Sequence, residues 1–171
     1  IYTGRSGFSG EFGHFSVFDN EIICRCGKKG CLETEVSGSA LHRILCEKVK
    51  SGQSSILSKR ILTEETSVTL EEIVDATNKE DILCIELVEE IGRKLGRYLA
   101  GLINLFNPEL VVIGGTLALT EDYILQPIKT AIRKYSLNLV SKDSAVVLSK
   151  LQAKAGVIGA CLLSRSKLFE W

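Results

Sequence analysis

The sequence predicts an α/β layered domain, and three features of its second half carry this prediction. Residues 79–106 have the long amphipathic pattern of a helix, whereas 110–113 and 145–148 are short apolar runs typical of strands. Helical patterns lie between these two runs and again at 156–168. The resulting order of helix, strand, helix, strand, helix is typical of layered α/β domains.

The composition is that of an ordinary globular domain. The 171 residues suffice for one domain with a sizeable core, and 45% of them are hydrophobic and 25% charged. The formal net charge is zero, so the chain lacks the basic character of a nucleic-acid-binding domain, and we expect DNA contact only through another segment. No apolar run is long enough to span a membrane, and no signal peptide is recognisable. The chain starts with Ile and contains no Met, so we expect a fragment that lacks its N-terminal portion.

The first half of the chain contains a hairpin pattern followed by helical patterns. Apolar strands flank Asp19-Asn20, a favourable turn pair, over residues 15–24. A helix is predicted over LHRILCEKVK, starting at Thr34 or Ser37 and capped by Ser37 or by the serine two residues later. Residues 51–69 are rich in Ser and Thr and predict a surface excursion, after which Thr69-Leu-Glu-Glu starts a short helix.

The helix predicted at 79–106 has two distinct lines of residues. Gly92, Gly96 and Ala100 recur at steps of four, and because glycine costs about 1 kcal/mol relative to alanine in a helix, another backbone is expected to pack closely there. Asn107-Pro108 ends the helix. The side chains expected on its buried face are Leu87, Ile91, Leu95, Tyr98, Leu102 and Phe106.

The following segments predict a buried strand and a divided helix. The run 110–113 is wholly apolar, which suits a central strand covered on both faces. Gly114-Gly115 ends it, and Thr120-Glu121-Asp122 starts a helix. Pro127 is expected to divide that helical segment and to restart a helix at its first position.

Three of the six cysteines are expected to be small hydrophobic core residues. Cys46, Cys84 and Cys161 each fall in a helical apolar pattern. Small disulfide scaffolds are short, loop-rich and poor in core, which this chain is not. We therefore expect a reducing compartment and a cytoplasmic location.

The other three cysteines, Cys24, Cys26 and Cys31, fall within eight residues. A Cys-Arg-Cys stretch does not easily close on itself as a disulfide, so the alternatives are free thiols in a loop or a metal site. A tetrahedral zinc site needs four nitrogen or sulfur ligands, so the three thiolates would need a fourth ligand from elsewhere in the chain.

The chain has two histidines that could supply the fourth ligand. His42 lies on the helix beyond the loop, whereas His14 precedes the hairpin, which could fold it next to the first cysteine. Gly27 and Gly30 would let the loop turn tightly around an ion. A Cys3His set is closed, so residues 14–31 predict a hairpin and loop that hold a structural zinc ion.

Four segments together resemble the ROK family of repressors, open reading frames and kinases: GEFGH at 10–14, CRCGKKGCLE at 24–33, NPELVVIGG at 107–115 and KAGVIGACLL at 154–163. The resemblance implies the actin-like, glucokinase-like (ribonuclease H-like) fold of two α/β lobes, with residues 1–171 as the C-terminal, sugar-binding part. It implies the zinc ligands His14, Cys24, Cys26 and Cys31.

The resemblance also implies that Glu11, His14 and Glu33 contact sugar hydroxyls. A carboxylate accepts two hydrogen bonds and suits vicinal hydroxyls. A histidine with one nitrogen on a metal keeps the other as a fixed donor. The alternative for Glu11 and Glu33 is that they are solvated loop acids.

Gly114-Gly115-Thr116 follows a predicted strand, where ligands collect in open α/β sheets. By resemblance this is the adenosine-side loop of the kinases, but many kinases have a third glycine where this chain has Thr116. The alternative is a plain turn between strand and helix.

Two principal functions follow from the resemblance. The first is the sugar-sensing domain of a transcriptional regulator for a hexose or N-acetylhexosamine, with DNA bound only by a missing N-terminal domain. The second is the C-terminal half of an ATP- and Mg²⁺-dependent sugar kinase. Because the family's catalytic aspartate lies upstream, this chain contains no catalytic residue and is expected to be inactive alone. A purely structural zinc module is a third alternative, and we expect a homodimer or higher oligomer.

Overall fold

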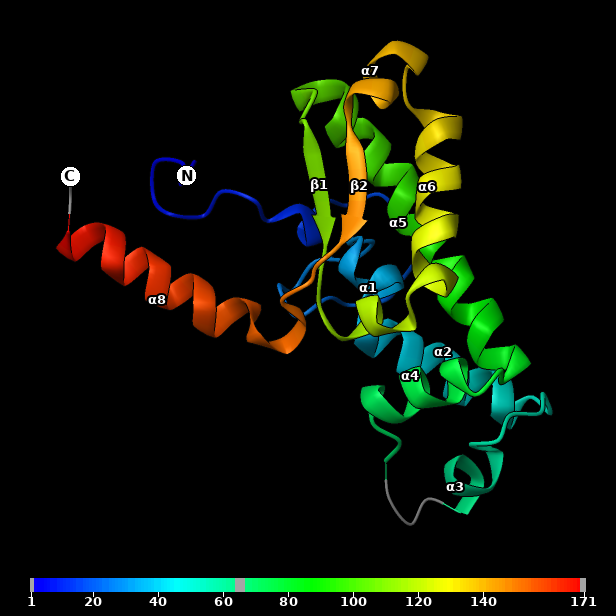
Figure 1. Ribbon diagram of the computed structural model, residues 1–171. Coiled ribbons are helices and arrows are strands. Elements are labelled where there is room, and N and C mark those ends of the chain that lie inside the picture. The colour runs from blue at the N-terminus through cyan, green and yellow to red at the C-terminus, as the bar shows by residue number, and fades with distance from the viewer. Residues whose placement is uncertain (1, 64–66, 170–171) are drawn as a thin grey trace.

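The computed structural model describes residues 2–63 and 67–169 (Figure 1). Within these residues two strands, β1 (Leu110–Ile113) and β2 (Ala145–Leu148), pair in parallel. The helices and 3-10 turns are η1 (Phe12–His14), α1 (Glu33–Val36), α2 (Gly38–Lys50), α3 (Ser58–Thr63), α4 (Leu70–Asn78), α5 (Ile82–Phe106), η2 (Thr116–Thr120), α6 (Asp122–Tyr135), α7 (Asn138–Asp143), η3 (Gln152–Lys154) and α8 (Ala155–Leu168). The helix–strand alternation predicted after residue 79 is confirmed.

The most extensive contact between two helices of the described chain is between α5 and α6. A Cβ atom placed on Gly92 would lie 2.9 Å from the carbonyl oxygen of Ile124, and one placed on Gly96 would lie 2.5 Å from that of Ile128. These distances leave no room for a side chain on either residue. The close approach of a second backbone, predicted from the glycine spacing, is therefore confirmed.

The buried face predicted for α5 is correct at its start and wrong at its end. Leu87 and Ile91 are buried, but the next three predicted residues are half-buried and Phe106 is 70% exposed. Because α6 covers the glycine line, the buried residues near the C-terminal end of α5 are Ala100 and Ile103.

β1 is not covered on both faces by the described residues, contrary to the prediction. Val111 and Ile113 pack against the core, whereas Leu110 and Val112 are 51% and 53% exposed. The two helices α5 and α6 both lie on one side of the β1–β2 pair (Figure 1). The strand therefore has one covered and one open face.

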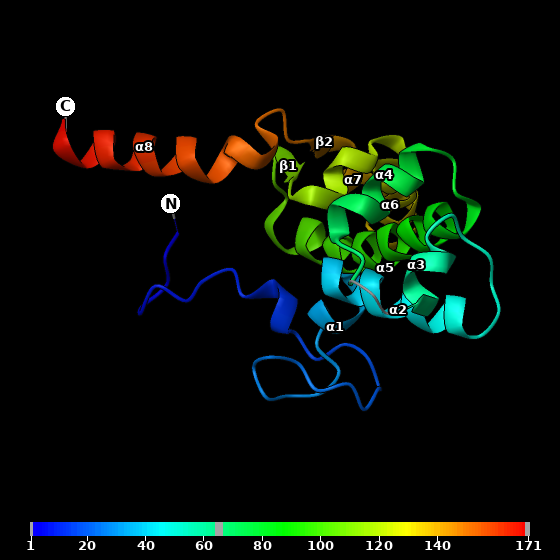
Figure 2. The ribbon, with the colours of Figure 1, turned by 90° about the horizontal axis from the view of Figure 1, so that it is seen from below.

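α8 extends away from the rest of the fold, as Figures 1 and 2 both show. It matches the predicted helix at 156–168 but packs mainly against η3. Cys161 is consequently exposed, so the prediction that it is a core residue is wrong, whereas Cys84 is buried and Cys46 half-buried. Among residues 2–63 and 67–169, no helix is both long and apolar enough to cross a membrane.

The predicted helix starts are largely correct. Ser37 caps α2 by accepting a backbone N–H at 3.1 Å, and Thr69 forms a capping box with Glu72 at the start of α4. The restart predicted at Pro127 is wrong, because α6 runs through it unbroken. Proline removes only one hydrogen bond of the helix, and its ring lies against Gly92 of α5, where tertiary packing supports the helix.

The hairpin predicted around Asp19-Asn20 is wrong in its pairing. Residues 15–18 pair with residues 30–32 and not with the segment directly after the turn, and Ser16 bridges Cys31. The turn preference of Asp19-Asn20 is local, whereas the observed pairing accompanies the complete burial of Cys31 and the residue after it.

The excursion at 51–69 is not purely a surface segment. α3 buries Ile61, which is 7% exposed, while 64–66 lie outside the described residues. Asp81, itself 6% exposed, ties the excursion to α5 because its carboxylate accepts hydrogen bonds from the amides of Ile56 (2.6 Å) and Cys84 (2.9 Å).

Replacing Asp81 with asparagine is expected to destabilise the fold by about 2 kcal/mol at pH 7. Burial opposes ionisation, but the two amide hydrogen bonds outweigh it and lower the pKa of Asp81. The stabilisation is therefore present above the unfolded pKa of about 4 and is lost as the pH falls through the lower folded value. Urea unfolding at pH 7 and pH 3 measures this, with the exposed Asp75→Asn as control. Equal stability of Asp81→Asn and wild type at pH 7 would contradict the assignment.

Candidate functional site

The cysteine-rich loop closes through a tight turn. The Cys24 amide donates to the Lys28 carbonyl, and the Gly27 amide donates back to the Cys24 carbonyl, each at 2.8 Å. Gly27 and Gly30 have φ values of +82° and +73°, in the left-handed region that favours glycine. A Cβ on Gly30 would also collide with the Phe18 carbonyl oxygen. The loop therefore depends on glycine where the sequence predicted it.

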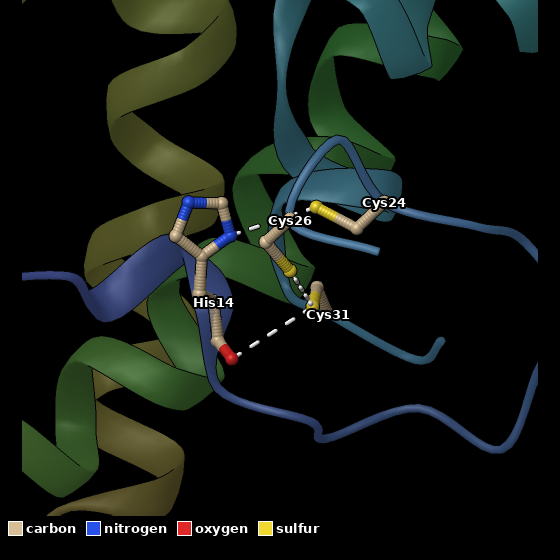
Figure 3. A group of neighbouring side chains, drawn as sticks. All are labelled: His14, Cys24, Cys26 and Cys31. Carbon is tan, nitrogen blue, oxygen red and sulfur yellow. Dashed lines mark hydrogen bonds between the residues drawn. The ribbon is translucent and has the colours of Figure 1, made fainter. Parts of the chain in front are cut away.

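Four potential metal ligands meet at this turn (Figure 3). One ligand atom from each of His14, Cys24, Cys26 and Cys31 lies within 4.8 Å of all the others. The His14 Nδ1–Cys24 Sγ distance is 3.5 Å and the Cys26 Sγ–Cys31 Sγ distance is 3.6 Å. Zinc–sulfur bonds of about 2.3 Å in a tetrahedron imply separations of about 3.8 Å, so the donor set fits a zinc ion.

The pKa values of two cysteines in the cluster are shifted in opposite directions. Burial, with smaller contributions from the neighbouring thiols, raises the pKa of Cys31 to about 11. The pKa of Cys26 is lowered, chiefly because its sulfur accepts a hydrogen bond from the Lys28 backbone. Metal ligation requires thiolates, so a divalent ion would offset the cost of ionising the buried sulfur.

The two histidines occupy different places. His14 directs Nδ1 to the cysteines and Nε2 toward Glu11, whose Oε2 lies 3.6 Å away. His42 lies on α2, where its Nε2 is 3.8 Å from the Cys46 sulfur. His14 therefore belongs to the cluster, and a carboxylate faces its outer nitrogen in the manner of metal-ligating histidines.

The three residues expected to contact sugar hydroxyls converge on η1. Glu11 precedes this turn, His14 ends it, and Glu33 reaches it from the start of α1. A Cβ placed on Gly13 would lie 2.9 Å from the Glu33 Oε2 atom, so the carboxylate rests against the bare backbone of Gly13. The Glu11 side chain is 59% exposed and that of His14 37%, so both remain open to a ligand.

A cavity of about 220 Å³ lies between the cysteine loop and the α1–α2 region. Its polar lining side chains are Arg25, Glu33, Thr34, Ser39 and Arg43. Cys24 lines the cavity as well, and it and Glu33 are the two lining residues that the sequence predicted as site residues. The two arginines and two hydroxyls form no sequence motif, because they come from the cysteine loop, α1 and α2.

The Gly114–Thr116 segment leads from β1 into η2. It follows β1, and beside it the Ser149 amide at the end of β2 donates to the Ile113 carbonyl at 2.8 Å. Gly115 has φ +85°, and Thr116 begins η2. A cavity of about 470 Å³ next to η2 is lined by Asn78 and by residues 119–123, but not by Gly114–Thr116.

Comparison with known proteins identifies relatives over almost the whole chain. A family model described as "ROK family" matches residues 1–167. The glucokinase of Thermotoga maritima is 31% identical over 168 residues, covering 98% of this chain and 53% of the glucokinase. The DNA-binding transcriptional dual regulator NagC of Escherichia coli is 33% identical over 168 residues, covering 98% of this chain and 40% of NagC.

Solved structures give the same two kinds of relative. A ROK family transcriptional regulator, a homologue of the E. coli MLC protein, has a TM-score of 0.77 at 32% identity, covering 86% of this chain and 36% of that one. A ROK family glucokinase from Streptomyces griseus, solved with glucose and AMPPNP, has a TM-score of 0.82 at 29% identity, covering 96% and 54%. The chain thus shares the fold of a part of these ROK proteins, and it spans about half the length of its curated relatives or less.

Proposed function

The chain belongs to the ROK family, and we propose that it is the sugar-sensing domain of a transcriptional regulator that binds a hexose or N-acetylhexosamine beside a structural zinc ion. The observation that carries the proposal is the convergence of Glu11, His14 and Glu33 on η1, directly next to the four-residue Cys/His cluster.

The chemistry of these side chains suits a polyhydroxylated ligand. The carboxylates of Glu11 and Glu33 accept hydrogen bonds from sugar hydroxyls, and ionised acceptors form the stronger hydrogen bonds. When bound by His14, Cys24, Cys26 and Cys31, zinc supplies a fixed structural centre. If Nδ1 of His14 held such an ion, Nε2 would carry the proton and could donate it in a hydrogen bond to the ligand or to Glu11.

Thr116 favours a regulator over a kinase. By the family resemblance, many kinases have glycine at this position of the nucleotide loop. In a regulator, the sugar would act by binding one domain arrangement more tightly than another, and so shift a DNA-binding part outside this chain.

A ROK sugar kinase is the second candidate, supported by the 31% identity to the T. maritima glucokinase and the TM-score of 0.82 to the S. griseus enzyme. It requires a base and a phosphate loop from outside this chain and would use ATP and Mg²⁺. Two assays on the full-length protein separate the candidates. A regulator predicts sugar-dependent release of DNA without ATP turnover, and robust sugar-dependent ATP turnover would contradict the regulator proposal.

Replacing Glu33 with glutamine is expected to weaken sugar binding about 10- to 100-fold, since hydrogen bonds to a charged acceptor contribute about 1.5–3 kcal/mol. Calorimetric titration of the full-length protein with glucose, N-acetylglucosamine, N-acetylmannosamine and xylose measures this. Glu86→Gln, at an exposed position of α5, is the matched control and should leave binding unchanged. Unchanged affinity in Glu33→Gln would remove this residue from the site.

A further inference from the structure

Glu35 forms a charged cluster between the metal-binding loop and the core helices. Its carboxylate accepts hydrogen bonds from Lys94 Nζ at 2.8 Å and from Asn20 Nδ2 at 3.0 Å, and lies 3.8 Å from an Arg43 nitrogen. The side chain of Glu35 is 15% exposed and that of Lys94 25%. One shielded carboxylate thus joins the loop, α1, α2 and α5.

An isolated bridge between Ile23 and Lys29 and the side-chain contacts of Asn20 join the segment around Asn20 to its surroundings. Between the pairing at residues 15–18 and the turn at Cys24, Asn20 accepts the Ile22 amide at 3.2 Å and donates to Glu35. Asn20 therefore links Glu35 by hydrogen bonds to the chain segment that ends at the metal ligand Cys24.

A second contact fixes the start of the same loop to α5. The Tyr98 hydroxyl donates to the Val17 carbonyl at 3.1 Å, and the Tyr98 ring packs edge-on against Phe18 at 5.4 Å. Lys94 and Tyr98 are one turn apart on α5, so this helix holds the loop at two points.

Glu35 also fixes the helix that carries Glu33. α1 has only four residues, too few to be stable without tertiary contacts. The Glu35–Lys94 contact anchors it to α5, and an Arg43 nitrogen donates to the Thr34 carbonyl at 3.1 Å. The orientation of α1, and hence of Glu33, thus depends on the Glu35 carboxylate.

We infer that Glu35 is a positioning residue that sets the geometry of both the metal centre and the sugar contacts, through Asn20 on one side and through α1 on the other. The inference rests on the proposed function, its sugar half on the sugar contacts and its metal half on the metal site formed by His14 and the three cysteines. Glutamine cannot replace Glu35, because its amide group would direct a donor at Lys94 or at Asn20, which already donate.

Cobalt(II)-loaded full-length protein provides the test, because its visible spectrum reports ligand geometry at temperatures far below unfolding. Glu35→Gln is expected to shift the cobalt spectrum, to speed metal loss to a chelator about tenfold, and to weaken sugar binding about tenfold. Glu90→Gln is the matched control, since Glu90 pairs with the same Lys94 at 2.9 Å from one turn earlier on α5, and it should change none of these.

Asn20→Ala keeps the Glu35–Lys94 pair and is expected to shift the cobalt spectrum and speed metal loss with a smaller effect on sugar affinity. A wild-type spectrum and rate of metal loss in Glu35→Gln, or equal changes in Glu90→Gln, would overturn the inference. If the wild-type protein binds no sugar, the proposed function fails, and the spectrum and metal loss alone decide the role of Glu35.

Discussion

Replacing Cys26 with serine is expected to remove the metal ion and to weaken sugar binding together. Cys26 supplies one of the four clustered ligand atoms, and a serine hydroxyl does not ionise as a thiol does at neutral pH. We expect the zinc content to fall from about one ion per chain to a small fraction, and the sugar affinity to fall about tenfold or more. Elemental analysis and calorimetric titration of the same preparation measure both.

Cys161→Ser is the matched control for this variant, because Cys161 is exposed on α8 outside the cluster. It should keep both zinc and sugar binding. If the Cys26→Ser protein lost zinc but bound sugar with unchanged affinity, the sugar contacts would not depend on the metal ion. Absence of zinc from freshly purified, unchelated wild-type protein would remove the metal site itself.

Replacing Gly96 with alanine is expected to destabilise the fold by about 2–3 kcal/mol. The new methyl group would lie 2.5 Å from the Ile128 carbonyl oxygen and 2.8 Å from the Ala131 Cβ atom. Backbone and Cβ atoms cannot rotate away, so α5 and α6 must separate. Urea unfolding of the full-length protein measures the loss.

Replacing Gly101 with alanine should instead raise the free energy of unfolding. Gly101 lies on the same helix but is exposed, and a Cβ atom there meets nothing within 4 Å. Alanine should therefore stabilise by about 0.5–1 kcal/mol through helix propensity alone. Stabilisation of similar size at Gly96 would contradict the close contact between α5 and α6.

The features predicted well from the sequence are those that depend on spacing within one segment. The steps of four between Gly92, Gly96 and Ala100 predicted that another backbone packs closely there, and the structure identifies this backbone as that of α6. The crowding of cysteines around Gly27 and Gly30 predicted a tight loop, and the structure brings His14 to it. Such patterns can be recognised within a short stretch of sequence because a single turn or a single helix face produces them.

The features that the sequence did not reveal depend on partners far apart in the chain. The turn preference of Asp19-Asn20 is local, and the structure has no turn at these two residues because residues 15–18 pair with residues 30–32 instead. Lys94 and Glu35 are separated by 59 residues, so no spacing rule links them. Similarly, the unbroken helix at Pro127 depends on its packing against α5.

The central claim is that a metal ion held by His14, Cys24, Cys26 and Cys31 keeps Glu11, His14 and Glu33 in place for a sugar. Calorimetric titration of one full-length preparation in three states tests it most directly: zinc-loaded, stripped by a chelator, and reloaded with zinc. We predict that the sugar bound most tightly by the loaded protein binds at least about tenfold more weakly after stripping, and that reloading restores its affinity. The same affinity in all three states, or no sugar binding by the loaded protein, would contradict the claim.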